Sequence, residues 1–352
     1  MNGVPLVFYE RVFSNIYTHT LKEASELSGT FGKRARCAYL GDVSYVVNVK
    51  NGIEIFGFLR YESSQRTSRT PKEIDAVPKK VVRAVEIYMQ GEKNENVCRK
   101  IVKRFPCARY VFVLCSHSID EAWIDFACRL KTLTRIVIVK KLEDDAILLF
   151  QKLVDCGNLL VLQIYEDAGE GGMMEVLKSL LCQDQFEELE ITNDGEMPCQ
   201  RYVVRELLQF WSQNSEKLRG KHLFVRDKCG GCVNQLEEFV IHRKLSALVP
   251  RLLNTPGIIS VPEFLSLLGV QWALKRCSKE ECDAVDKYYR IIANPSCVYK
   301  FEEGQRCDLR RLYISFECMS GRDIEELGPA SHAGHDQLSL MGGTGLLHVV
   351  FD

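Results

Sequence analysis

The chain has 352 residues, of which 46% are hydrophobic and 26% charged, and its 46 Lys and Arg nearly balance 47 Asp and Glu. This composition is typical of a folded protein, and the length fits two or three units or one elongated repeat array. The formal net charge of −1 gives no electrostatic reason to expect nucleic acid, and no apolar run approaches the roughly 20 residues that cross a bilayer. We therefore expect neither a nucleic-acid nor a membrane partner.

Fifteen cysteines are scattered singly along the chain, and several stand inside apolar runs, such as Cys115 in YVFVLC and Cys128 in IDFACRL. The first residues include the acidic Glu10 and lack the basic region and apolar core of a secretory signal. In a chain of this length, the pattern predicts reduced, buried thiols that act as small hydrophobic residues. We expect the protein in the cytoplasm or the nucleus.

Residues 1–40 begin with apolar residues at helical spacing. The first stripe consists of residues that fall four apart: Val4, Phe8, Val12 and Ile16. A second set follows after Thr20: Leu21, Ala24, Leu27 and Phe31. Two helices this short do not bury their apolar faces alone, so we expect them to pack on the rest of the chain or on another protein.

Residues 41–80 read as a connector. Two alternating runs within 42–61 flank Asn51-Gly52, which is the strongest short signal for a β-hairpin. The following stretch, 62–80, is rich in Ser, Thr, Lys and Arg, and predicts an exposed loop or linker.

Residues 81–232 repeat one unit. Six β-branched runs begin at intervals of 25 to 27 residues, with a last interval of 34. Their paired apolar positions are Val85/Ile87, Val111/Val113, Ile136/Ile138, Leu162/Ile164, Leu189/Ile191 and Leu223/Val225. The intervening segments have helical periodicity: 96–105, 118–130, 142–154, 171–182 and 202–214. Ser118 and Glu121 have capping-box spacing at the start of the second helix.

This layout fits a β/α solenoid, and it also matches the βαβ pattern of a doubly wound sheet. The even period and the lack of a phosphate-binding turn favour the solenoid. The segments that begin at Leu133, Leu159 and Phe186 resemble the L-x-x-L-x-L-x-x-N core of leucine-rich repeats, at a period similar to that of the repeats in F-box proteins. Only Asn193 stands near the asparagine of that core, one position early, so we expect an irregular array.

Residues 233–352 follow a different pattern, which predicts an α+β cap over the end of the array. Helices are expected over 233–245, 261–277 and 278–293, and strands over 297–304, 310–318 and 346–352. In RRLYISFEC, Leu312, Ile314 and Phe316 are expected to point inward while the other face is solvated. The last strand is expected to complete a sheet.

The opening residues resemble the F-box motif, which docks proteins onto the Skp adaptor of cullin–RING ubiquitin ligases. Val4-Pro5 matches the opening pair of that motif, and Phe31 stands where the family usually has Trp. The resemblance implies an adaptor-binding set: Pro5, Phe8, Val12, Ile16, Leu21, Leu27 and Phe31. The motif departs from the family at Thr18-His19-Thr20, where the family favours a proline and an acid.

The whole layout resembles the nematode F-box-associated proteins. The expected fold is α/β: an F-box-like helical pair, then an irregular leucine-rich-like β/α solenoid with an α+β C-terminal cap. The resemblance implies a non-enzymatic receptor of a Skp–cullin–F-box ubiquitin ligase, which binds the adaptor and cullin complex and an unknown protein substrate. Aromatic or Arg residues at strand ends are the expected substrate anchors: Tyr165, Arg201 and Arg226.

Two alternatives stand beside this hypothesis. The first is a leucine-rich-like interaction scaffold whose opening helices only cap their own array. The second is a zinc- or thiol-dependent enzyme, whose candidate residues are Cys229 and Cys232 with Cys277 and Cys282 or with His222 and His242, or else His332, His335 and Asp336. The Cys229–Cys232 pair reads more simply as a Gly-Gly turn, and His332–Asp336 as a solvated loop, so we expect no metal and no cofactor.

Overall fold

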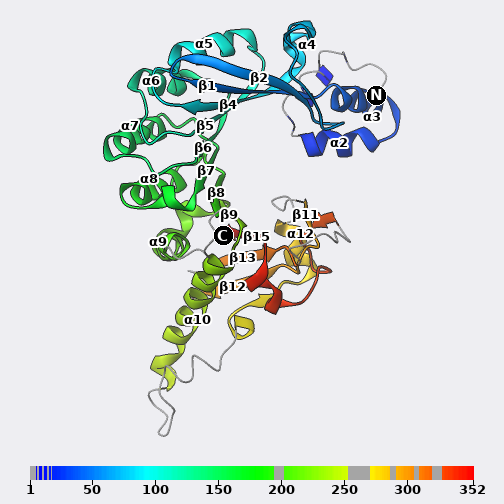
Figure 1. Ribbon diagram of the computed structural model, residues 1–352. Helices are drawn as coiled ribbons and strands as arrows, with labels where there is room; N and C mark the ends of the chain where they lie inside the picture. Colours follow the sequence, from blue (N-terminus) through cyan, green and yellow to red (C-terminus); the bar gives the residue numbers. More distant parts are fainter. Residues whose placement is uncertain are drawn as a thin grey trace. The chain divides into compact units, whose positions relative to one another are not determined.

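The computed structural model describes Pro5, Phe8, Tyr9, Val12, Phe13 and Ile16, and residues 18–193, 202–252, 270–285, 291–304, 309–318 and 327–352. They form two compact units, Met1–Leu159 and Leu160–Asp352, which are taken separately below. Both units are mixed α/β and combine parallel with antiparallel strands (Figure 1). None of the described helices has both the length and the apolar content needed to cross a membrane.

The first unit is built on six strands in the order β6-β5-β4-β1-β2-β3. Its elements are α2 (Thr18–Glu26), α3 (Gly29–Leu40), β1 (Val43–Lys50), β2 (Ile53–Tyr61), β3 (Arg66–Ser68), α4 (Pro71–Ala76), η1 (Lys79–Val81), β4 (Val82–Gln90), α5 (Glu95–Arg104), β5 (Arg109–Leu114), α6 (Glu121–Arg129), β6 (Leu133–Ile138) and α7 (Asp144–Asp155). Strands β1, β4, β5 and β6 are parallel, while β2 and β3 run antiparallel to their neighbours. Helices α5, α6 and α7 lie on one face of the parallel strands (Figure 1).

The second unit has the strand order β10-β12-β13-β15-β9-β8-β7, and β11 pairs separately with β14. Its elements are β7 (Val161–Tyr165), η2 (Glu166–Gly169), α8 (Gly172–Leu181), β8 (Glu188–Asn193), α9 (Val203–Leu218), β9 (His222–Asp227), α10 (Gly230–Leu252), η3 (Val270–Trp272), β10 (Lys275–Arg276), α12 (Lys279–Val285), β11 (Ile291–Ala293), β12 (Tyr299–Glu303), β13 (Arg310–Phe316), β14 (Leu327–Pro329), η5 (Leu338–Gly343) and β15 (Leu346–Phe351). Strands β7, β8 and β9 are parallel, and β15, β13, β12 and β10 continue antiparallel.

All six predicted repeat runs are strands, and the predicted helices between them are present. In β5, Tyr110 and Phe112 rather than the paired positions Val111 and Val113 lie in register with the buried Val85 and Ile87 of β4. Five apolar residues in succession make both faces of this strand look alike, so periodicity alone does not choose between them. The predicted capping box is wrong: α6 begins after Asp120, whose carboxylate accepts from the backbone of Ala122 at 3.0 Å.

The predicted hairpin is confirmed, with β1 and β2 joined at Asn51 (φ 48°) and Gly52 (φ 78°). The prediction of a plain exposed loop over 62–80 is wrong, because β3 and α4 lie there. The Glu73 carboxylate holds this segment together by accepting from the hydroxyls of Tyr61 and Ser68 and from Arg66. Side-chain hydrogen bonds of this kind do not follow the periodic spacing from which helices and strands are predicted, so the sequence pattern did not reveal them.

The C-terminal strands are confirmed, and β15 completes the sheet between β9 and β13. Leu312, Ile314 and Phe316 are buried as expected, but the prediction of a solvated second face is wrong. Tyr313 on that face packs in a buried cluster with Cys277, Cys282, Val298, Ala330 and Val350. The predicted helix over 278–293 is also wrong in extent, since α12 ends at Val285 and 291–293 form β11; most of the helix predicted over 261–277 lies outside the described residues.

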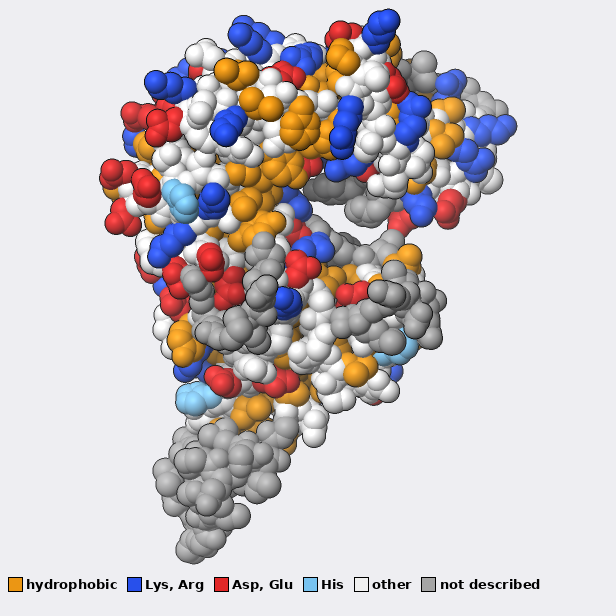
Figure 2. All heavy atoms as spheres, viewed as in Figure 1, with side chains coloured by type: hydrophobic (Ala, Val, Ile, Leu, Met, Phe, Trp, Pro, Cys, Tyr) orange, Lys and Arg blue, Asp and Glu red, His pale blue; other side chains and the backbone are white. Residues whose placement is uncertain are grey.

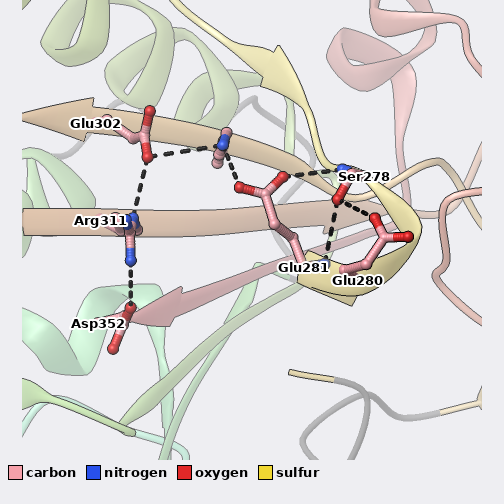
Figure 3. A network of polar contacts seen from close by, with 7 residues as sticks. Ser278, Glu280, Glu281, Glu302, Arg311 and Asp352 are labelled. Carbon is pink, nitrogen blue, oxygen red and sulfur yellow. Dashed lines mark hydrogen bonds and ion pairs between the residues drawn. The ribbon is translucent and has the colours of Figure 1, made fainter. Parts of the chain in front are cut away.

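A network of charged side chains ties α12 to this sheet (Figure 3). Ser278 and Glu281 form the reciprocal bonds of a capping box, at 2.9 and 3.3 Å. Lys300 pairs with Glu281 and lies 3.7 Å from Glu302, and Arg311 lies 3.0 Å from Glu302. Asp352 follows at 3.9 Å from Arg311, so the end of β15 joins the same network.

The prediction that Cys128 is a reduced, buried thiol is wrong, because it forms a disulfide with Cys156. The bridge links the last turn of α6 to the residue that follows α7, with 5.7 Å between the two Cα atoms. Neighbouring helices bring together residues 28 apart in sequence, which their separate runs do not show. Other cysteines, such as Cys98 and Cys297, are buried and free, as predicted.

Candidate functional site

The opening residues and helices α2 and α3 share a small core of their own. Its fully buried members are Tyr9, Phe13, Leu21, Ala24 and Ala35. Of the seven predicted adaptor-binding residues, Leu21 belongs to this core, and Val12, Ile16 and Phe31 pack against it half-buried. The remaining three are exposed: Pro5, Phe8 at 53% and Leu27 at 58%.

Aromatic contacts hold this core together. The ring centroid of Phe31 lies 5.2 Å from that of Phe13, in an edge-to-face arrangement, and 6.1 Å from that of Tyr9. Phe31, at the position where the family has Trp, is therefore mainly an internal packing residue. Tyr9 and Phe13 follow the predicted stripe by one position and have the same spacing of four, so the sequence offered two adjacent stripes.

Arg83, which the sequence did not single out, fastens the opening residues to β4. Its guanidinium donates to the carbonyl oxygen of Ile16 at 2.8 Å and to that of Phe13, and lies 3.6 Å from Asp42. Burial lowers the pKa of Arg83, and the nearby Asp42 carboxylate opposes that shift. By bonding two backbone carbonyl oxygens and lying beside a carboxylate, the Arg83 guanidinium holds the opening segment against the sheet of the first unit.

In the second unit, two of the three predicted anchors lie in one row across the strands. Tyr165, Thr192 and Arg226 pair in register on β7, β8 and β9, and Arg201 lies outside the described residues. This row alternates with the fully buried Ile164, Ile191 and Val225, so it faces away from the helices. Arg226 donates to Glu190 at 2.6 Å; the Arg226 side chain is 37% exposed and that of Glu190 1%.

The same face continues onto β15 as an aromatic row. The Phe224 ring stacks on His348 with centroids 4.1 Å apart, and His222 Nδ1 lies 3.0 Å from His348 Nε2. His348 is almost fully buried. The row has no local sequence signal, because His222 and His348 lie 126 residues apart. Phe224 is covered as well, at 1% exposed, so on β9 only His222 and Arg226 of this row are partly accessible to a partner.

A groove of about 580 Å³ lies in the first unit, beyond the carboxyl ends of β4, β5 and β6. Open parallel sheets commonly bind ligands at this edge, and that rule could have drawn attention to CSHS after β5. Burial raises the pKa of Cys115, while Lys140 opposes the shift, so the thiol stays protonated at neutral pH. His117 Nδ1 lies 2.7 Å from the carbonyl oxygen of Lys141, so this nitrogen is engaged with backbone. The groove is thus better equipped for binding than for nucleophilic chemistry.

The residues considered for metal or thiol chemistry are dispersed. Cys229 and Cys232 are fully buried at the start of α10, so the expected Gly-Gly turn is part of that helix, and the Cys229 thiol donates to the carbonyl oxygen of Asp227 at 2.7 Å. Burial raises the pKa of Cys277 to about 12 and that of Cys282 to about 11, so both thiols are protonated at neutral pH. Within the described ranges, no cluster of three His, Cys, Asp or Glu side chains is arranged to hold a metal ion.

The segment with the two histidines is ordered by backbone bonds. The carbonyl oxygen of His335 accepts from Cys297 at 2.9 Å, and Asp336 bonds Arg276 at 3.0 Å and the Tyr299 hydroxyl at 2.8 Å. The Asp336 carboxylate therefore stabilises the fold.

No family model, curated protein or solved structure matches the chain.

Proposed function

We propose that the chain is a non-enzymatic receptor of a Skp–cullin–F-box type ubiquitin ligase. The opening residues bind the Skp-type adaptor, and the strand face of the β/α repeats binds a protein substrate. The observation that carries the proposal is the outward placement of Phe8 and Leu27, which stay 53% and 58% exposed although the helices already have a closed core. Exposed apolar residues beside a complete core are typical of a docking surface.

The strand order supports the repeat part of the proposal. Strands β4, β5 and β6 of the first unit lie beside one another in chain order, and so do β7, β8 and β9 of the second. A doubly wound sheet reverses its direction, whereas successive right-handed crossovers without reversal place the helices on one face, as in a solenoid. Asn193 Nδ2 donates to the carbonyl oxygen of Lys228 in the next repeat at 3.1 Å, as expected of a leucine-rich-like asparagine.

The adaptor half is tested with the full chain and a purified Skp-type adaptor by isothermal titration calorimetry. We expect the parent to bind, and Phe8→Ser and Leu27→Ser each to weaken binding at least tenfold, since burying such a side chain is worth about 1.5–3 kcal/mol. Both residues are exposed, so neither change should alter the thermal melt. Leu148→Ser on α7, which removes a side chain that is 67% exposed, is the matched control and should bind like the parent.

The scaffold without a ligase role is the second candidate, and a specific observation favours it. Val12 and Ile16 are half-buried within the chain, and Arg83 fastens the segment to β4, as expected of an internal cap. A well-folded parent that does not bind the adaptor would establish this reading and end the ligase proposal. Full burial of Cys229 and Cys232 weighs against the thiol-enzyme alternative.

A further inference from the structure

Strand β2 of the first unit has a free edge. It pairs with β1 along its length, but β3 pairs only with Leu59, Arg60 and Tyr61. In the described part of the chain, no strand pairs with the outer edge of β2 from Ile53 to Phe58. Alternate backbone N–H and C=O groups there point away from β1 and are available to another strand.

The free edge carries an apolar patch. Ile53, Ile55 and Phe56 are 63%, 55% and 49% exposed. Figure 2 shows hydrophobic side chains gathered over this part of the first unit. A single exposed apolar residue is ordinary, but three within four residues on an unpaired edge form a site where an added strand would bury them.

The strand is held rigidly from its other side. The Tyr45 hydroxyl donates to Glu54 at 2.5 Å, and Arg104 donates to both oxygens of the same carboxylate at 3.1 and 2.9 Å. Tyr45 crosses Gly57 so closely that a Cβ there would lie 2.1 Å from the hydroxyl oxygen. A strand fixed in this way loses little conformational entropy when a partner binds.

The charges around the edge favour an acidic partner. Lys50 stands opposite Ile53, the backbone of Lys93 abuts the hairpin turn at Gly52, and Arg69 lies 5.9 Å from the centroid of the Phe58 ring. All three side chains are exposed, and none has an ion pair with a described residue. Beside these three cations stand the exposed Glu92 and, on the strand itself, Glu54, whose carboxylate is already paired with Arg104.

We propose that the Ile53–Phe58 edge of β2 binds an extended peptide segment as an added strand, with apolar residues at alternate positions and carboxylates at its ends. Backbone bonds supply the pairing, the exposed isoleucines and Phe56 pack on the apolar residues, and the unpaired cations attract the carboxylates. The site is separate from the opening helices, and it does not rest on adaptor binding.

The test measures fluorescence anisotropy with the full chain and a labelled probe peptide, Glu-Glu-Val-Thr-Val-Thr-Val-Glu, without any adaptor. We expect saturable binding that weakens at least tenfold when Ile53→Ser and Ile55→Ser are combined, or when Lys in the probe replaces Glu. A probe N-methylated at alternate backbone positions should lose binding, because it keeps every side chain and lacks the N–H groups. Leu148→Ser is the matched control and should bind like the parent.

Unchanged binding of the N-methylated probe would overturn strand addition, since side-chain contact alone would then suffice. Failure of the probe to bind a folded parent would overturn the proposal, whatever the adaptor experiment gives. Sedimentation supplies a further check on the occupant. A concentration-dependent dimer that Ile55→Lys abolishes would assign the edge to a second copy of this chain and refute the peptide proposal.

Discussion

The Cys128–Cys156 bridge should contribute several kcal/mol to the stability of the first unit. The perturbation is Cys156→Ser, at an exposed position where serine adds no volume. The two residues are 28 apart in sequence. Closing a loop of that length in the unfolded chain removes entropy worth about 3.5 kcal/mol at 25 °C.

The assay is a thermal melt with and without a reductant. For a unit of this size, about 3.5 kcal/mol corresponds to a midpoint lower by about 10 °C. The parent in dithiothreitol should match Cys156→Ser, and reductant should not affect the variant. Cys37→Ser, at an exposed free cysteine of the same unit, should melt like the parent under both conditions.

Two outcomes would refute this reasoning. Equal midpoints for the parent with and without reductant would mean that the bridge does not constrain the unfolded chain. Loss of the reductant effect in Cys37→Ser would mean that another pairing is responsible. Alkylation and mass spectrometry of the unreduced parent should find Cys128 and Cys156 protected.

Three further predictions concern the first unit. Gly57→Ala should destabilise it by about 2–3 kcal/mol in urea unfolding, because the new Cβ would lie 2.1 Å from the hydroxyl oxygen of buried Tyr45; an unchanged midpoint would contradict the close packing. Arg83→Met should raise amide hydrogen exchange in α2 and α3 while leaving α5–α7 protected, because it removes the donor that holds the opening segment; uniform exchange would argue against that role. Burial alone would raise the pKa of Glu54, but bonds from Arg104 and Tyr45 outweigh it and lower the pKa. The stability that Glu54 contributes should thus be complete above the ordinary carboxyl pKa of about 4.3 and be lost as the pH falls through its lowered folded-state pKa. The free energy of unfolding, measured between pH 3 and 6, should show this loss for the parent. It should not show it for Arg104→Met.

Local patterns predicted most of the elements. Asn51-Gly52 identified the hairpin because only residues that accept positive φ suit its turn. The repeat strands and helices were found because burial on one face imposes a period of 2 or 3.6. What failed was non-local: the second covered face of β13 depends on Cys277 and Ala330, which lie in other segments. Glu73 likewise orders its segment through side-chain bonds that leave no period.

The candidate sites show the same division. Helical spacing found the opening stripe, but Tyr9 and Phe13 have the same spacing as Phe8 and Val12. Only packing against Leu21 decided which stripe became core. The free edge of β2 could not be predicted for a different reason. A strand lies at an edge only when no neighbouring strand pairs with it, and the residues of the strand itself do not show which strands pair with it.

The insertion of β15 between β9 and β13 imposes an order on folding. His222 and His348 on paired strands lie 126 residues apart, so β9 is made long before its antiparallel neighbour. At a synthesis rate of roughly 5 to 20 residues per second, β9 waits about 6 to 25 s for that neighbour. During this time the nascent second unit holds an unpaired edge with three successive apolar residues, Leu223, Phe224 and Val225, which is the kind of segment that chaperones shield.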